Sequence, residues 1–205
     1  KLTADIDFKT RFSKTKNASD PSSNQEESAN KSVSKNLNES QQAAVNAIVS
    51  EGIHQTPKTP FLVFGVTGSG KTEVFMNVLQ ELLKTDPFAQ ALVLVPEISL
   101  TPQTTRIFQD RFSGKVAVVH SAMNDQDRWD ELNRIRSGHA SILIGPRSAV
   151  FGPFKNLKLI IVDEEHDSSY KQGTGLLYNA RDIAVVRGKM EQAAVVLGSA
   201  TPSME

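Results

Sequence analysis

The fold of this chain is decided by residues 61–72, which read FLVFGVTGSGKT. The first four are apolar and stop at a glycine, a pattern that is typical of a buried strand. The other eight have the spacing Gly, four residues, Gly-Lys-Thr, and residues 74–83 then place apolar side chains at helical spacing. A strand, a glycine-rich turn and a helix in this order are the setting of a phosphate-binding loop, and a chance turn is the weaker alternative.

Such a loop has a defined chemistry. Its glycines let backbone N–H groups point inward, where these donors and the positive end of the helix dipole hold an anion. We expect Lys71 to contact the β- and γ-phosphates of ATP, and Thr72 to offer its hydroxyl to Mg²⁺. The residues of the loop that we expect to bind the nucleotide are Gly65, Thr67, Gly68, Ser69, Gly70, Lys71 and Thr72.

A second apolar run, residues 159–162, ends in three carboxylates and a histidine, Asp163 to His166. Ligands of parallel sheets gather at the carboxyl ends of the strands, so we expect these acids to face the phosphate loop. Asp163 would hold Mg²⁺, directly or through water, and Glu164 would orient the attacking water. Lys71, Asp163 and Glu164 are therefore the expected catalytic residues. A solvated acidic loop is the alternative, and the phosphate loop counts against it.

The rest of the chain alternates apolar runs with helical patterns. This alternation predicts an α/β fold with a mostly parallel sheet and helices on both faces. Trp129 has helical spacing with Leu132 and Ile135, so we expect it in the core. Further strands are expected at 91–95, 116–119, 142–144 and 194–197, and helices at 127–136 and 181–190.

Composition bounds the remaining possibilities. The chain has 205 residues, a formal net charge of zero and no cysteine, which excludes disulfides and thiolate metal sites within it. No apolar run approaches membrane-spanning length, so we expect a cytoplasmic protein without a membrane partner. Residues 17–36 are mostly Ser, Asn, Lys and Glu. Such a stretch cannot offset its ordering entropy, so we expect 1–36 to be a disordered linker or the end of a preceding domain, and 37–205 to form the ATP-binding domain.

Four further segments carry a family resemblance. They read VPEISLTPQ at 95–103, GPRSAVF at 145–151, DEEHDSSYKQ at 163–172 and GSATP at 198–202. Together with the phosphate loop they resemble superfamily 2 helicases, and more specifically the PriA family of bacterial primosomal helicases, over residues 37–205. The resemblance implies a RecA-like P-loop NTPase domain, the first motor lobe. It places the second lobe and a zinc-binding module outside this chain.

The resemblance also implies roles for individual residues. Gln41 would read the adenine edge, while Asn38 is also a suitable N-cap for a helix. His166, Ser199 and Thr201 would couple the acidic segment to the state of the γ-phosphate. Residues 168–178 resemble a loop that couples DNA binding to hydrolysis, but Leu177-Tyr178-Asn179 departs from the expected Arg-Tyr-His, which leaves a surface loop as the alternative. The expected DNA contacts are Pro96, Thr101, Gln103, His120, Ser121, Arg147, Ser148, Tyr170, Lys171 and Tyr178.

The implied function is that of a monomeric ATP-dependent DNA helicase. It would unwind stalled or forked replication DNA and initiate primosome assembly for replication restart, with primosome proteins and single-strand-binding protein as partners. The isolated chain is expected to bind ATP weakly, to hydrolyse it poorly and not to unwind DNA. The alternatives are another superfamily 2 translocase, a non-catalytic nucleotide- and DNA-binding module and a P-loop kinase, which would need a lid and an acceptor pocket.

Overall fold

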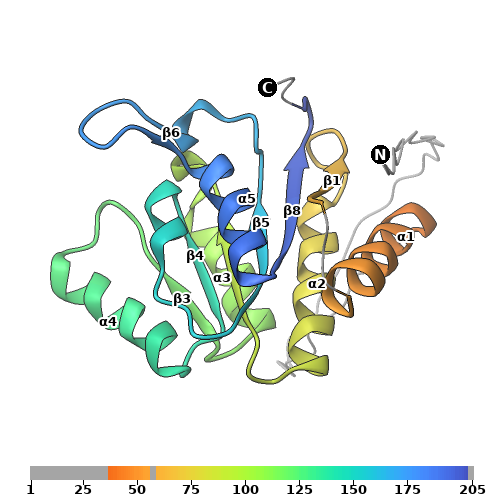
Figure 1. The fold of residues 1–205 in the computed structure, drawn as a ribbon, viewed down its shortest axis with the longest axis horizontal. Helices are drawn as coiled ribbons and strands as arrows, with labels where there is room; N and C mark the ends of the chain where they lie inside the picture. The colour runs from red at the N-terminus through yellow and green to blue at the C-terminus, as the bar shows by residue number, and fades with distance from the viewer. Residues whose placement is uncertain (1–36, 56–58, 203–205) are drawn as a thin grey trace, which may run out of the picture.

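A parallel sheet of six strands forms the centre of the molecule (Figure 1). The computed structural model describes residues 37–55 and 59–202, so the linker prediction for 1–36 falls outside the described residues. The strand order is β1-β8-β5-β2-β4-β3, and each neighbouring pair is parallel. The strands are β1 (Phe61–Phe64), β2 (Gln90–Leu94), β3 (Val116–Val118), β4 (Ile142–Gly145), β5 (Leu157–Val162) and β8 (Ala194–Ser199).

Helices cover both faces of this sheet, as the apolar runs predict. On β2, Ala91 and Val93 pack into one core cluster, and Leu92 and Leu94 pack into the other. Strands buried on both faces read as continuous apolar runs, which explains why their sequences do not alternate. The first face carries α1 (Glu39–Ala47), the π-helical turn η1 (Ile48–Ile53), α2 (Lys71–Thr85) and α3 (Pro102–Arg111), and the second carries α4 (Asp125–Ser137) and α5 (Ala180–Glu191).

Polar side chains cap the helices at residues that the sequence marks. Asn38 caps α1 in a reciprocal arrangement with Gln41, and Thr101 caps α3 ahead of Pro102. These side chains accept hydrogen bonds from backbone N–H groups that have no partner within the helix. Short elements join the larger ones, namely η2 (Glu97–Ser99), η3 (Arg147–Phe151), η4 (Ser168–Tyr170) and a hairpin of β6 (Lys171–Gln172) and β7 (Tyr178–Asn179).

Trp129 is not in the core, so the prediction for it is wrong. Its side chain lies on α4 and is 56% exposed, whereas Ile135 is fully buried. In the part of the chain that the structure describes, no helix has the length and apolar character needed to cross a membrane.

Candidate active site

The phosphate loop joins β1 to α2 and has the backbone that its glycines predict. Gly68 and Gly70 have φ angles of +80° and +86°, in the left-handed region that glycine adopts at little cost. Gly65 is tied to β8 by its N–H, which donates to the Ser199 carbonyl at 3.0 Å. No side chain caps the start of α2. The N–H groups of Lys71 and Thr72, at the start of this helix, are therefore available to an anion, as a phosphate site requires.

Lys71 is the first residue of α2 and is only 7% exposed. Its Nζ donates to the Gly65 carbonyl at 2.8 Å and lies 3.4 Å from Glu164 Oε1. The loop and the end of β5, 93 residues apart, thus meet through this lysine, as predicted from the edge where parallel strands end. Nearby, the buried Ser69 Oγ has no hydrogen-bond partner.

Asp163 follows the last residue of β5 and carries an unfavourable negative charge. Burial and the neighbouring Glu164 carboxylate raise the pKa of Asp163 to about 6, although Lys71 and the Glu164 N–H act in the opposite direction. That N–H donates to Asp163 Oδ1 at 3.0 Å. Glu164 itself has a φ of +45°, which costs a non-glycine residue energy. A partly buried carboxylate with a raised pKa is a suitable ligand for a divalent cation.

Glu165 differs from its two acidic neighbours, and the prediction that it faces the loop is wrong. Its side chain is 5% exposed, and its Oε2 accepts from Arg181 Nη1 on α5 at 3.3 Å. Its backbone N–H donates to the Gly198 carbonyl at 2.9 Å. Glu165 therefore anchors the acidic turn to α5 and β8.

The residues expected to couple the acidic segment to the nucleotide lie close together, and their coupling role stays a prediction. His166 Nδ1 lies 2.9 Å from Ser199 Oγ and 3.7 Å from Glu164 Oε2. Ser199 is fully buried and accepts a hydrogen bond from the Thr201 backbone N–H at 3.2 Å. Thr201 takes part through its backbone, since no hydrogen bond of its hydroxyl is seen among the described residues.

Gln41 holds the phosphate loop in this structure. Its Oε1 accepts from the Asn38 N–H at 2.9 Å, and its Nε2 donates to the Ser69 carbonyl at 2.9 Å. The capping role of Asn38 and the placement of Gln41 beside the loop are thus seen together. Recognition of adenine by Gln41 stays a prediction.

Among the expected DNA contacts, Tyr170 requires a correction. Its side chain is 1% exposed, and its hydroxyl donates to the Asp163 carbonyl at 2.6 Å. A ring buried in this way cannot stack on a base, so the prediction for it is wrong. Sequence alone does not show that η4 folds the ring inward. Asp167 accepts from the Ser169 N–H at 2.7 Å and fixes this turn.

The other expected contacts lie in three places. Arg147 Nη1 donates to the carbonyls of Ser169 and Lys171 at 3.1 and 3.3 Å, so it also supports the η4 turn. Tyr178 is half-buried and meets the Phe151 ring edge-on at 5.3 Å. Pro96 is buried, which leaves its ring little surface to offer DNA. The expected contacts that are exposed are Thr101, Gln103, His120, Ser121, Ser148 and Lys171.

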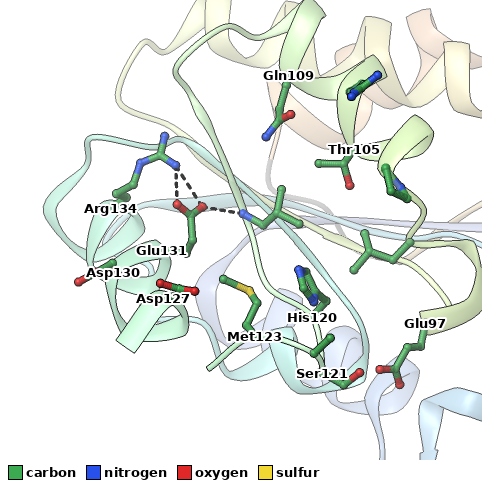
Figure 2. A pocket seen from close by; sticks show the side chains of 15 residues that line it. Glu97, Thr105, Gln109, His120, Ser121, Met123, Asp127, Asp130, Glu131 and Arg134 are labelled. Atoms are coloured by element: carbon green, nitrogen blue, oxygen red, sulfur yellow. Dashed lines mark hydrogen bonds and ion pairs between the residues drawn. The ribbon is translucent and has the colours of Figure 1, made fainter. Parts of the chain in front are cut away.

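His120 and Ser121 line a groove of about 860 Å³ between α3 and α4 (Figure 2). Thr105 and Gln109 lie on its α3 side, while the α4 side carries Asp127, Asp130, Glu131 and Arg134. Glu131 is paired with Arg134 at 2.9 Å. Carboxylates repel phosphates, so this wall counts against a DNA strand within the groove. Contact between DNA and His120 or Ser121 stays a prediction.

Comparison with known proteins gives related sequences and a related fold. A family model described as DEAD/DEAH box helicase matches residues 38–205. The replication restart protein PriA of Chlamydia pneumoniae is 48% identical over 172 residues, which cover 83% of this chain and 23% of that protein. PriA of Bacillus subtilis strain 168 is 44% identical over 169 residues, which cover 82% of this chain and 21% of that protein. The structure of RecG bound to a three-way DNA junction matches with a TM-score of 0.59 and 26% identity, over 82% of this chain and 21% of the other.

Proposed function

Since this chain belongs to the DEAD/DEAH box helicase family, we propose that it is the ATP-binding first lobe of an ATP-dependent DNA helicase. The observation that carries the proposal is the meeting of Lys71 and Glu164 at 3.4 Å, between a glycine-rich loop and the end of a parallel strand. Phosphoryl-transfer sites need a cation and a carboxylate close to the terminal phosphate, and this pair brings the two groups to one place beside the phosphate loop.

The residues present fit a nucleotide and its magnesium ion. The Glu73 and Val74 N–H groups donate to the Gly70 carbonyl, whereas no hydrogen bond of the Lys71 and Thr72 N–H groups or of the Ser69 hydroxyl is seen among the described residues, and a triphosphate would accept from these donors. Asp163, with its raised pKa, and Thr72 are the residues that would hold the ion. Magnesium would supply positive charge where the phosphates carry negative charge.

The protein side chains then have separate tasks. Lys71 would exchange the Gly65 carbonyl for phosphate oxygens, and Glu164 would orient water toward the terminal phosphate. His166 and Ser199, in contact at 2.9 Å, would link that water site to β8. Catalysis of this kind depends on position and charge more than on covalent chemistry, so small displacements of the acidic turn would change the rate.

The activity of the whole protein is part of the same proposal. The chain spans 23% and 21% of the length of two curated relatives, both called replication restart protein PriA. We infer that the whole protein unwinds forked replication DNA for replication restart in the bacterial cytoplasm, with primosome proteins and single-strand-binding protein as partners. The residues 37–205 alone would hydrolyse ATP poorly, because helicase motors hold ATP between two lobes.

Unwinding of a labelled forked duplex by the whole protein tests this proposal. We expect ATP-dependent strand separation that is lost in Lys71→Ala. Lys84→Ala is the matched control, because Lys84 lies on the same helix with its side chain 73% exposed and should leave unwinding unchanged. The proposal is rejected if the unmodified protein does not separate the strands, and the site assignment is rejected if Lys71→Ala still does.

A further inference from the structure

A polar contact joins α3 to the first turn of α2. Arg111, the last residue of α3, donates from Nη1 to Glu73 Oε1 at 2.9 Å. The two side chains are 13% and 20% exposed, so water screens the pair only partly. Glu73 directly follows Thr72 in the phosphate-loop helix. Arg111 therefore contacts a residue that is next to Thr72, the proposed magnesium ligand.

The arginine reaches along α2 over two turns. Its Nη2 donates to Gln80 Oε1 at 3.2 Å, and Asn77 Nδ2 donates to the same Glu73 oxygen as Arg111, at 3.2 Å. Residues 73, 77 and 80 lie on one face of a helix because side chains recur there every three or four positions. The planar guanidinium can bond two acceptors in fixed directions, which a lysine cannot do. The contact thus fixes both the distance and the direction of α3 relative to α2.

Little of α3 is buried. Phe108 is the one buried residue within the helix, and Phe112 is buried just after it. Ile107 is 48% exposed, and the exposed start of the helix carries Thr101 and Gln103, which we expect to contact the DNA backbone. The helix has ten residues and is about 15 Å long. Because a helix of this length is rigid, a displacement at its start would also displace Arg111 at its end.

We propose that Arg111 is a positioning residue that transmits DNA contact at the start of α3 to the phosphate loop, through Glu73. The inference rests on the proposed function, since it needs a DNA-stimulated ATPase. DNA bound at Thr101 and Gln103 would shift α3, and the Arg111–Glu73 pair would shift the first turn of α2 with it. Thr72 and Lys71 lie in that turn, so the geometry of the nucleotide site would respond.

The test is a comparison of ATP turnover by the whole protein with and without saturating forked DNA. In Arg111→Gln we expect turnover without DNA to stay within about twofold, while the stimulation by DNA falls about fivefold or more, a size typical of coupling changes. Arg111→Lys should retain an intermediate stimulation. Arg134→Gln is the control, because Arg134 on α4 also pairs with a glutamate, Glu131, and with a carbonyl group, that of Gly114. DNA affinity is measured for each variant by fluorescence anisotropy, so that saturation is known.

A double-mutant cycle separates coupling from loss of stability. Glu73→Gln together with Arg111→Gln should reduce stimulation no further than Arg111→Gln alone, because both changes remove one interaction. The inference is overturned if Arg111→Gln keeps full stimulation, if it lowers both rates equally, or if the two changes add. Absence of stimulation in the unmodified protein would instead reject the proposed function, and this inference with it.

Discussion

The negative charge of a single residue, Asp163, lowers the stability of the ligand-free protein, and a ligand can relieve this loss of stability. Its carboxyl is partly buried beside Glu164, and the pKa rises from 3.8 to about 6. A group whose pKa is higher in the folded protein stabilises it at low pH, and that stability is lost as the pH rises through the folded pKa. The ionised Asp163 therefore destabilises the metal-free chain at neutral pH, by about 3 kcal/mol from the size of the shift.

Asp163→Asn should accordingly stabilise the protein at pH 8, measured by thermal unfolding with EDTA and without nucleotide. The gain should shrink as the pH is lowered from 6 to 4, because the carboxyl of the unmodified protein then takes up its proton. Asp167→Asn is the control of opposite sign. The Ser169 hydrogen bonds lower the pKa of Asp167, so its contribution is present at neutral pH and lost in acid. A constant difference across this pH range would contradict the assignment for Asp163.

A second prediction at the scale of single residues concerns Gly68 and Gly70 of the phosphate loop. Gly68→Ala should cost about 1 kcal/mol, because the φ of +80° is unfavourable for alanine but no atom lies within 4 Å of the new methyl group. Gly70→Ala should cost about 1 kcal/mol more, because its methyl group displaces the Gln41 amide from the Ser69 carbonyl. In a Gln41→Ala background the two substitutions should cost the same, as measured by urea unfolding. A persistent difference would place the extra cost elsewhere.

At the scale of elements, η4 links the expected DNA-contact segments to the acidic turn. Arg147 supports the turn through two carbonyls, and the Tyr170 hydroxyl reaches back to the Asp163 carbonyl. The backbone position of Asp163 thus depends on the tyrosine hydroxyl. This arrangement explains why an aromatic residue in a surface turn is 1% exposed.

Tyr170→Phe should therefore destabilise the chain by about 1–2 kcal/mol, since it removes a buried hydrogen bond and leaves its acceptor without a partner. The same change at Tyr178 should cost close to nothing, because that ring is half-buried and its structural contact is with the Phe151 ring. Chemical denaturation of the two variants is the measurement. Equal effects would show that the Tyr170 hydroxyl does not support the acidic turn.

The elements that the sequence predicts well are those set by local pattern alone. The strand over 61–64 and the capped start of α3 are found where expected, because apolar runs and an N-cap before proline depend on near neighbours. The expectation that this strand is buried is wrong, because β1 lies at the edge of the sheet and only Val63 is buried in it. The prediction that Trp129 lies in the core is wrong for a geometric reason. Residues spaced by three rotate about 60° per step around a helix, so Trp129 lies about 120° from the buried Ile135. The orientations of Tyr170 and Glu165 depend on partners distant in sequence, and no local pattern contains them.

At the scale of the molecule, the sheet brings the phosphate loop, the acidic turn and β8 to one edge. The site is built from segments around residues 65–72, 163–166 and 198–201, which parallel strands collect at their carboxyl ends. The expected DNA contacts at Thr101 and Arg147 follow β2 and β4 at the same edge. Nucleotide and DNA would therefore share one side of the domain, which is the physical basis for coupling them.

The most direct test of that claim is the ATP turnover of the whole protein, measured with and without forked DNA. We expect slow turnover alone, at least about tenfold faster turnover with DNA, and loss of both in Glu164→Gln, which keeps the size of the side chain but not its charge. Turnover that does not respond to DNA, or that survives in Glu164→Gln, would contradict the assignment of this domain as a DNA-coupled motor lobe.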